Sequence, residues 1–491
     1  MLNRLNGCRS LLVLFTSIAM VGDGWAAEVR VSPKDDVDRV AKSLRGGDVL
    51  VLENGRWRDV RLTLDRLPGT EASPIHIRSE TPGGAVFTGQ SSLRLSGRHA
   101  IVSGLVFRNL VGISDPVQLR SHSERLAEHC RITDCVFEQA SSSGEADTSR
   151  WLSVYGTHNR VDHCYFGGKT NPGTTLVVWV GSHAGKHRID HNHFGPRPPL
   201  GSNGGETIRI GTSDVSEWDS ATVVEDNYFH RCDGEAEIVS NKSCGNIYRY
   251  NVFDTCSGAL TLRHGHRCVV DANQFLGRQA RGTGGVRIIG RDHIVTNNYF
   301  EGLRGDAERA AISLMNGVPD GPLHLYAPVV AAVVSNNTFI DCKVTFEIGV
   351  GAGKKHSGKT QSAAPSRCVF THNMVQPVKW SVFRIHAVMS DTLWSSNLLQ
   401  PGKRAAGGPF DFSERQFGLM RHETGMMRPF DADTLRSETK SPVEFDIDGQ
   451  RRTDRTLAGC DDPVTPKRRP ISPANTGPRW QTQMRKSLSQ K

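Results

Sequence analysis

A four-residue motif that ends in phenylalanine recurs along most of this chain, and it limits the folds that the chain can adopt. Most copies have the form Asn-x-Phe, with an apolar residue three or four positions before the Asn. The copies lie at residues 104–107, 134–137, 163–166, 191–194, 226–229, 250–253, 272–275, 297–300 and 336–339, and weaker ones at 372–375 and 396–399. Short strand-like runs, and no convincing helix, separate them.

The spacing of the motif indicates a solenoid. Successive phenylalanines are 22 to 39 residues apart, which fits a period near 24 with insertions. We therefore predict an all-β fold, a single-stranded right-handed parallel β-helix, in which Asn stacks on Asn of the next coil and Phe stacks inside. A β-propeller, the main alternative, would need longer and more even repeats. Val37, Val40, Ala41 and Leu44 have helical spacing, so we expect residues 34–44 to form an N-terminal capping helix.

The two ends of the chain differ from the repeat. Residues 1–26 have Arg4 and Arg9 before an apolar run, then small residues, which is the pattern of a signal peptide. We expect a secreted or periplasmic protein, because no later stretch reaches the roughly 20 apolar residues of a membrane helix. Residues 27–400 are the predicted parallel β-helix domain. Residues 401–465 would extend the solenoid or be irregular, and residues 466–491 would form a basic, disordered tail.

The net charge of +9 belongs mainly to the ends. Residues 1–26 carry a net +1 and residues 466–491 carry +7, so the body is close to +1. A basic surface for nucleic acid is therefore not expected, and only locally clustered arginines can attract an acidic partner. We expect a monomer without a membrane span.

The ten cysteines after residue 26 follow the repeat. Buried cysteines stacked between coils are the favoured interpretation. A disulfide between Cys232 and Cys256 is the alternative, because neighbouring coils about 4.8 Å apart would bring the two within reach.

Charged residues gather in the middle of the solenoid. Glu235 and Glu237 are two apart in a strand-like segment, so both carboxylates point to one face. Lys242 follows five residues later, and Arg263 and His264 lie about one coil further on. Paired carboxylates repel each other unless a cation lies between them. Two acids, a lysine and an arginine could therefore share one surface.

The strand pattern predicts which side chains point outward. Leu260 and Leu262 alternate with Arg263, and Val286 and Ile288 alternate with Arg287. Because the apolar set must face the core, both arginines project outward. We expect them to line the floor of a groove beside the two glutamates.

These segments resemble a known family. Residues 203–211, 233–243, 260–265 and 284–290 are similar to the core of the family-six polysaccharide lyases, which include alginate lyases and chondroitinase B. The resemblance spans about residues 28–400 and is most specific at 203–300; the chain's length suggests a single-solenoid form. It implies Ca²⁺-assisted β-elimination on a uronic-acid polymer, alginate or dermatan sulfate. By position it implies the following roles: Lys242 as base, Arg263 as acid, Asn203, Glu235 and Glu237 as calcium ligands, and Glu206 as a less certain ligand.

The chemistry also follows from the residue types. Removing the proton alpha to a carboxylate is difficult unless a hard cation neutralises the carboxylate, and Glu and Asn oxygens suit Ca²⁺. Lys242 can act as the base only if it is partly neutral, which nearby positive charge favours. Because a guanidinium barely deprotonates, stabilisation of the leaving oxygen is an alternative role for Arg263, and His264 is another candidate for the acid. Arg287 and Arg209 would bind neighbouring sugar carboxylates.

Other interpretations stay open at this point. The charged residues could form a structural ladder of ion pairs. A glycoside hydrolase could use Glu235 and Glu237 but would not explain Lys242. A non-catalytic polysaccharide-binding solenoid would need no catalytic residue. Residues 353–360 match a phosphate-loop pattern, but Gln361–Ser366 would break the helix that such a loop must open, so a basic loop beside the groove is favoured.

Overall fold

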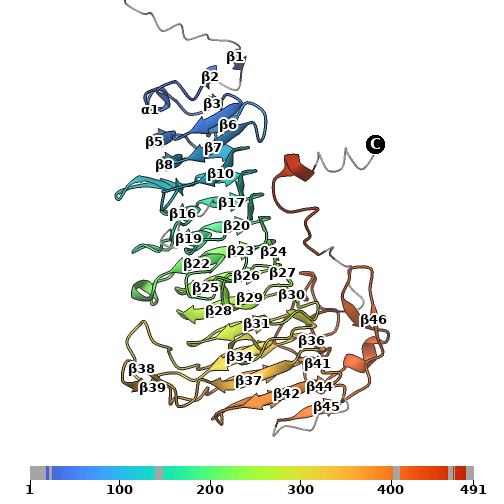
Figure 1. Ribbon diagram of the computed structural model, residues 1–491. Helices are drawn as coiled ribbons and strands as arrows, with labels where there is room; N and C mark the ends of the chain where they lie inside the picture. The colour runs from blue at the N-terminus through green and yellow to red at the C-terminus, as the bar shows by residue number, and fades with distance from the viewer. Residues whose placement is uncertain are drawn as a thin grey trace, which may run out of the picture.

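Three long sheets surround one apolar core in the computed structural model (Figure 1). The structure describes residues 18–20, 25–138, 148–401, 410–462, 468 and 470–482. In each coil the chain contributes strands to three sheets in turn, which we name I, II and III. Strands of successive coils pair in parallel, for example β17 (Arg160–Asp162) with β20 (Arg188–Asp190). The predicted parallel β-helix is therefore confirmed.

The three sheets contain most of the described strands. Sheet I runs in the order β1 (Ile18–Met20), β2 (Trp25–Val31), β3 (Val49–Leu52), β6 (Ile75–Ser79), β9 (Ala100–Ser103), β14 (Arg131–Thr133), β17, β20, β23 (Val223–Glu225), β26 (Ile247–Arg249), β29 (Val269–Asp271), β32 (Ile294–Thr296), β35 (Val333–Ser335), β40 (Val369–Thr371), β43 (Leu393–Ser395). Sheet II runs β4 (Gly55–Arg58), β7 (Ala85–Gly89), β10 (Val106–Leu110), β15 (Val136–Glu138), β18 (Tyr165–Gly167), β21 (His193–Phe194), β24 (Tyr228–His230), β27 (Val252–Asp254), β30 (Gln274–Leu276), β33 (Tyr299–Glu301), β36 (Thr338–Ile340), β41 (Met374–Gln376), β44 (Asn397–Leu399), β45 (Phe412–Glu414). Sheet III runs β12 (Arg120–His122), β13 (Arg125–Glu128), β8 (Ser92–Arg98), β11 (Val117–Gln118), β16 (Leu152–Val154), β19 (Leu176–Val178), β22 (Ile208–Gly211), β25 (Glu237–Lys242), β28 (Gly258–His264), β31 (Thr283–Ile288), β34 (Ile312–Met315), β37 (Val344–Val350), β42 (Ser381–Ile385), with β5 (Arg61–Pro68) paired to β8.

The recurring motif forms two internal columns. Phenylalanines of sheet II stack face to face, for example Phe253 on Phe275 with ring centres 4.8 Å apart. The asparagines form a hydrogen-bonded ladder, in which Asn251 donates its backbone N–H and its side-chain amide to Asn273 Oδ1 at 3.0 and 2.9 Å. Ala272, directly before Asn273, has a φ of 55°, so each such turn bends sharply and turns its Asn inward. The predicted stacking of Asn and Phe is confirmed.

A short helix occurs near the N-terminus, as the sequence predicts. Helix α1 spans Val37–Ala41, and its buried residues Val37 and Ala41 pack with Leu44 in the main core. The helix is shorter than the predicted 34–44 segment, and Leu44 lies beyond its last turn. Its capping role stays a prediction. Of the predicted signal peptide, residues 1–26, the structure describes β1 and residues 25 and 26. The rest lies outside the described residues.

The C-terminal part begins as an extension of the solenoid and then becomes irregular. β45 pairs in parallel with β44, whereas β46 (Leu419–Arg421) and β47 (Met427–Pro429) form an antiparallel hairpin, followed by the 3₁₀ turn η3 (Ala432–Leu435). Of the two other 3₁₀ turns of the described chain, η1 (Ser213–Val215) follows β22 of sheet III and η2 (Ala307–Arg309) precedes β34 of sheet III.

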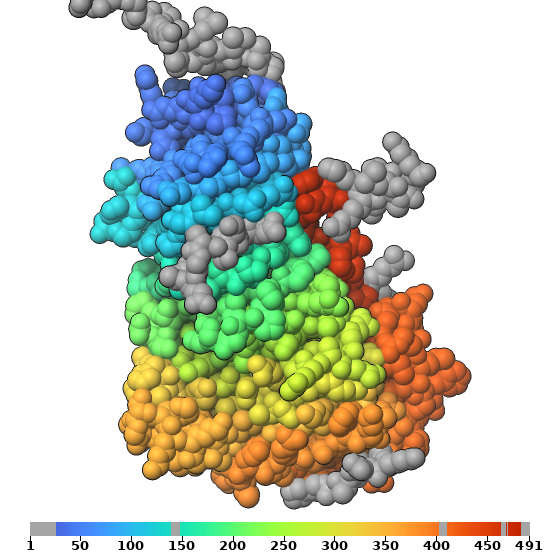
Figure 2. Space-filling model, in the orientation of Figure 1, coloured from blue at the N-terminus to red at the C-terminus, as the bar shows by residue number. Residues whose placement is uncertain are grey.

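Residues 470–482 differ from the predicted disordered tail. This segment runs back along the outside of the solenoid (Figures 1 and 2). The Arg479 guanidinium forms an ion pair with Asp134, Trp480 Nε1 donates to the Asp134 carbonyl at 2.9 Å, and Ile471 is buried. Composition favoured disorder, but an ion pair and apolar contacts with the solenoid wall hold the segment in place.

The described cysteines are all buried and unpaired as thiols. Cys256 Sγ accepts the backbone N–H of Cys232 at 3.4 Å, so the two residues stack on neighbouring coils without a covalent bond. The favoured interpretation, stacked buried cysteines, is confirmed over the disulfide alternative.

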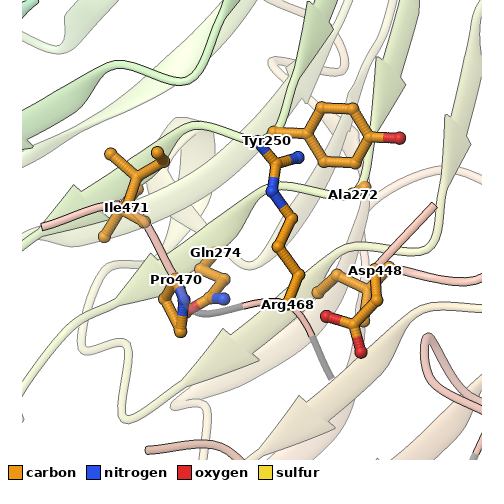
Figure 3. A pocket seen from close by; sticks show the side chains of 9 residues that line it. Tyr250, Ala272, Gln274, Asp448, Arg468, Pro470 and Ile471 are labelled. Carbon is orange, nitrogen blue, oxygen red and sulfur yellow. The ribbon is translucent and has the colours of Figure 1, made fainter. Parts of the chain in front are cut away.

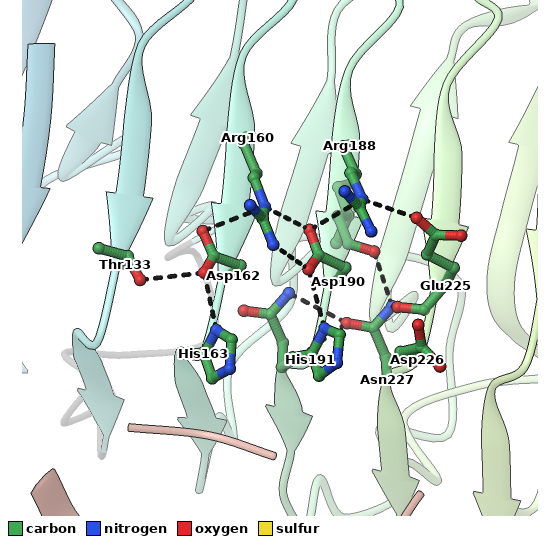
Figure 4. Close-up of polar contacts among 12 residues, drawn as sticks. Thr133, Arg160, Asp162, His163, Arg188, Asp190, His191, Glu225, Asp226 and Asn227 are labelled. Atoms are coloured by element: carbon green, nitrogen blue, oxygen red, sulfur yellow. Dashed lines mark hydrogen bonds and ion pairs between the residues drawn. The ribbon is translucent and has the colours of Figure 1, made fainter. Parts of the chain in front are cut away.

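The outer face of sheet I shows what a structural charge ladder looks like in this fold (Figure 4). Arg160 donates to Asp190 at 2.8 and 2.6 Å, and Arg131 donates to Asp162 at 2.6 Å through two nitrogens. Burial alone would raise the pKa of Asp162, but hydrogen bonds from Arg131 and His163 and the nearby charges of Arg131 and Arg160 hold that pKa well below its usual value. Each acid here has a basic partner, and the ladder stabilises the coils.

Buried histidines make the stability of the fold sensitive to acid. His293 is fully buried, its Nδ1 accepts the Cys268 N–H at 3.2 Å, and its Nε2 lies 3.0 Å from the Ile289 carbonyl. Burial lowers the pKa of His293 to about 4. Since the unfolded chain takes up this proton near pH 6.5 and the folded chain does not, stability is lost as pH falls from about 6.5 to about 4, by about 3 kcal/mol for this residue.

We therefore compare the free energy of unfolding in urea at about pH 7.5 and about pH 4.5. We expect this free energy to fall less for His293→Gln than for the wild type when the pH is lowered. The exposed His183 offers a matched control, His183→Gln, which should keep the wild-type pH dependence. An equal loss in wild type and His293→Gln would contradict the assignment.

Candidate active site

The predicted site residues lie on the outer face of sheet III, on β22, β25, β28 and β31, where the coils set their positions. Ser240 pairs with Thr261, and Thr261 pairs with Arg287, so these residues form one outward column. Arg209 on β22 belongs to the same column, because it pairs with Ser240. The pleat that buries Leu260 and Leu262 thus directs Arg287 and Arg209 outward, as predicted.

A shift in register places Arg263 beside Lys242. Asn241 pairs with Leu262, but Lys242 pairs with His264, so Arg263 is the extra residue of a bulge on β28. Bulges re-aim side chains at the edges of functional sites. Here the bulge brings the basic side chains of Lys242, Arg263 and His264 onto neighbouring strands at the same end of the sheet.

Arg263 and Arg287 share two partners. Glu237 Oε1 lies 3.7 Å from Arg263 Nε and 3.4 Å from Arg287 Nη1. The guanidinium of Arg263 lies 4.1 Å from the ring centre of Tyr326, whose hydroxyl accepts a hydrogen bond from Arg287 at 2.8 Å. Burial lowers the pKa of Arg263, an effect to which the charge of Arg287 adds. Tyr326 therefore fixes the orientation of both arginines.

Glu235 differs from the acids of the sheet I ladder. Its Oε2 accepts the Gly204 N–H at 2.9 Å, and its Oε1 is buried without a hydrogen-bond partner. Burial, with the negative charges of Glu206 and Glu237, raises the pKa of Glu235 to about 7. A structural ion pair would lower that pKa, and among the described residues Glu235 forms no ion pair, in contrast to the acids of the ladder on sheet I.

The donor set of this carboxylate cluster fits a hard cation. Glu206 is buried and accepts a hydrogen bond from Thr174 at 3.1 Å, and the exposed Asn203 directly precedes Gly204 in the chain. Carboxylate and amide oxygens are the ligands that Ca²⁺ prefers. Both carboxylate oxygens of Glu237 accept hydrogen bonds, from Ser240 and Arg287. The Glu237 side chain would therefore have to rotate to bind a cation.

His264 is placed as a neutral group. It is 3% exposed, its Nδ1 lies 3.4 Å from Arg263 Nη1, and its Nε2 lies 3.2 Å from Ser213 Oγ. Burial, with the positive charges of Arg263 and Lys242, lowers the pKa of His264 to about 2. An imidazolium is therefore not available at neutral pH, which weakens the candidacy of His264 as an acid.

The sequence did not indicate Tyr326 or Ser213 as site residues. Tyr326 belongs to the long insertion that widens the spacing between Phe300 and Phe339 to 39 residues. That insertion is the one signal that could have drawn attention to it. The predicted basic loop at 353–360 lies nearby: β38 (Lys355–His356) and β39 (Lys359–Thr360) form a hairpin, not the helix of a phosphate loop, and the His356 ring lies 5.8 Å from the Tyr326 ring.

Two other features of the described chain lie away from sheet III. The pocket in Figure 3 is formed where Arg468 and Ile471 cover Tyr250, Ala272 and Gln274, and it contains none of the predicted site residues. Among the described residues, one group of three His, Cys, Asp or Glu side chains has its possible metal-ligand atoms within 4.8 Å of one another. This group consists of Asp446, Asp448 and Asp461.

This aspartate group could hold a metal ion, but Arg428 Nη1 already lies 2.8 Å from Asp461, and no predicted ligand belongs to the group. In the part of the chain that the structure describes, no helix is both long and apolar enough to cross a bilayer.

Comparisons with known proteins agree with this arrangement. The family model for Chondroitinase B matches residues 31–399. The PL6 family alginate lyase AlyGC is similar with a TM-score of 0.83 and 36% identity over 92% of this chain, which spans 59% of that protein's length. A mannuronic acid specific family 6 lyase from the human gut microbiota has a TM-score of 0.70 and 31% identity, and the match covers 80% of this chain and 92% of that one. A comparison with curated protein sequences found no match.

The solenoid carries basic side chains and carboxylates on one sheet and matches these proteins over most of its length, so it is homologous to the polysaccharide lyases. Within this class, the chain belongs to polysaccharide lyase family 6, the family of the Chondroitinase B model and of both relatives named above. A PL6 alginate lyase in complex with a trisaccharide has the same fold, with a TM-score of 0.69 at 22% identity.

Proposed function

We propose that this chain cleaves alginate by calcium-assisted β-elimination. The observation that carries the proposal is the pairing of Lys242 with the bulged end of β28, which places a lysine next to Arg263, whose Nε lies 3.7 Å from Glu237 Oε1. An amine, a guanidinium and a group of cation-binding oxygens are what an elimination on a uronate requires.

Lys242 is the base in this proposal. In its neutral form, the Nζ atom takes the proton from C5 of the uronate, the electron pair of the C5–H bond forms the C4–C5 double bond, and the bond from C4 to the glycosidic oxygen breaks. No carboxylate is needed as a nucleophile, which separates this reaction from hydrolysis.

Arg263 stabilises the leaving oxygen. Its guanidinium is a fixed donor whose orientation Tyr326 and Glu237 determine, so it can donate a hydrogen bond to the oxygen as negative charge develops. Either Arg263 or a water molecule that it orients delivers the final proton. His264 is neutral and buried, so we assign it the role of supporting Arg263 through the contact at 3.4 Å.

Asn203, Glu235 and Glu237, with Glu206, would hold Ca²⁺. When bound, the cation would neutralise the substrate carboxylate and make the C5 proton more acidic. The buried Glu235 Oε1 without a hydrogen-bond partner supports this ligand set. Arg287 and Arg209 would bind the carboxylates of neighbouring sugars.

Alginate is the proposed substrate because the two relatives above 30% identity are named as an alginate lyase and a mannuronic acid specific lyase. Dermatan sulfate is the second candidate, because the matching family model is Chondroitinase B. The basic hairpin with Lys355 and Lys359 lies near Tyr326 and would be the place for a sulfate. Export of a monomeric protein stays a prediction from the sequence.

Ultraviolet absorbance of the unsaturated product tests the proposal. Alginate and dermatan sulfate are compared in parallel, each with Ca²⁺ and with a chelator. We expect a calcium-dependent rise on alginate. A rise on dermatan sulfate alone would replace the substrate, and no rise on either polymer with folded protein would contradict the proposal.

A further inference from the structure

The column of side chains that carries Lys242 continues along sheet III, away from Arg263. On β22 this column contains Gly211, which has no side chain. On the three preceding coils the column contains Trp179, Tyr155 and Arg120. The strand pairs Val178 with Ile210, Val154 with Val178, and Gln118 with Ser153 fix this register. Because neighbouring strands are about 4.8 Å apart, Trp179 lies about 10 Å and Arg120 about 19 Å from the Lys242 strand.

Guanidinium groups flank the two aromatic rings of this column. The rings of Tyr155 and Trp179 are stacked, with centres 5.7 Å apart and planes at 7°. Arg120 lies 3.9 Å from the centre of the Tyr155 ring, and both Arg150 and Arg209 lie 5.4 Å from the centre of the Trp179 ring. Such contacts hold the side chains in fixed positions, so the surface is preorganised.

The positive charge of this surface exceeds its negative charge. Asp115 binds Arg150 through two hydrogen bonds of 2.7 and 2.8 Å. Among the described residues, the side chains of Arg120 and Arg209 form no hydrogen bond or ion pair with a carboxylate, although the charges of Glu206 and Asp115 lie near Arg209. Arg120 donates to the neutral Gln118 at 3.1 Å. The indole Nε1 of Trp179 and the Nε of Arg209 are buried without a hydrogen-bond partner. Donors without partners beside half-exposed rings suit a ligand with both carboxylates and sugar faces.

Gly211 places no side chain between this surface and Lys242, because the neighbouring backbone excludes one. Its φ is 83°, and an added Cβ would lie 2.5 Å from the Lys242 carbonyl oxygen. A chain that passes over Gly211 can therefore contact Trp179 on one side and Lys242 on the other.

We propose that Trp179, Tyr155 and Arg120, with Arg150 and Arg209, form a distal subsite that binds the acidic polysaccharide several sugar units away from the bond that is cleaved. The rings pack against sugar faces, and the arginines bind uronate carboxylates. The inference rests on the proposed function and extends it: the enzyme favours long chains over short oligosaccharides, because only long chains reach both Lys242 and Arg120.

The test compares long alginate chains with alginate trisaccharides. We expect Trp179→Ala and Arg120→Ala each to lower the ratio of kcat/KM on long chains to kcat/KM on trisaccharides by about tenfold, which corresponds to the loss of one well-packed contact. The change should lie in KM. Trp179→Phe, which keeps a ring, should recover most of the ratio. Phe430→Ala removes an exposed aromatic outside sheet III and should leave the ratio at the wild-type value.

Calorimetric binding in the non-cleaving Lys242→Met background gives a second readout. Affinity should rise with chain length, and Trp179→Ala should remove most of that rise. If wild type cleaves alginate but the variants keep its length dependence, the column is a structural brace and the subsite is wrong, while the proposed function stands. If wild type neither binds nor cleaves any uronate polymer, the proposed function fails and the subsite fails with it.

Discussion

Lys242→Met should lower kcat on alginate by at least about a thousandfold, because removing a general base typically costs a hundredfold to ten-thousandfold and no second base lies beside it on β25. Methionine keeps most of the length and the apolar stem of lysine, so the substitution should leave the fold intact. The outward Nζ has no role in the core, where Leu260 and Leu262 are buried. The loss should appear in kcat rather than in KM, since Arg287 and Arg209 would still bind the sugar carboxylates.

A matched variant and a stability measurement make this result interpretable. Lys42 is an exposed lysine at the C-terminal end of helix α1, and Lys42→Met should keep wild-type activity. Thermal unfolding of Lys242→Met should occur within a few degrees of wild type, since surface substitutions usually change stability by less than about 0.5 kcal/mol. Full activity in a folded Lys242→Met protein would show that another group removes the proton.

Glu235→Ala should abolish most calcium binding and lower kcat/KM by about a hundredfold or more, because the variant loses a ligand that anchors the cation at a buried position. The physical reason is the charge of the site. Burial and the negative charges of Glu206 and Glu237 raise the pKa of Glu235 to about 7, and a bound divalent cation would relieve the repulsion among the three carboxylates. Calorimetry with Ca²⁺ alone measures the binding directly, and a chelator should reduce wild-type activity to the level of Glu235→Ala.

The control for this prediction is Glu423→Gln, which changes an exposed glutamate in the C-terminal hairpin and should affect neither binding nor rate. Removing a carboxylate from a repulsive cluster should also leave Glu235→Ala as stable as the calcium-free wild type, or more stable. Unchanged Ca²⁺ binding in Glu235→Ala would exclude this glutamate as a ligand. It would then direct attention to the aspartates at 446, 448 and 461.

Some of the candidate site could be predicted from the sequence because the fold is repetitive. In a solenoid, residues one coil apart lie on neighbouring strands, so the order Glu237, Lys242, Arg263, Arg287 along the chain becomes an order in space. The alternation of Leu260 and Leu262 with Arg263 then fixed the direction of the arginine. The bulge at Arg263 was not predictable, because a one-residue shift leaves the same alternation in the sequence.

Other parts depend on contacts that no local pattern encodes. Tyr326 reaches Arg263 and Arg287 from an insertion, and insertions have no fixed register with the coils. The ion pair between Arg479 and Asp134 joins residues 345 positions apart, and it orders a segment whose composition favours disorder. The neutral state of His264 follows from burial among positive charges, which the sequence lists but does not bring together.

The sequence by itself determined the coil, its Asn and Phe columns, the outward direction of the basic side chains and the family to which they correspond. These features repeat at short range, and hydrophobic burial selects one register for all of them. Only the tertiary structure decided which acids have basic partners, which carboxylate repels its neighbours and which aromatic residues orient the arginines. Electrostatic and packing energies depend on distance and burial in space, and these quantities exist only once the coils are stacked.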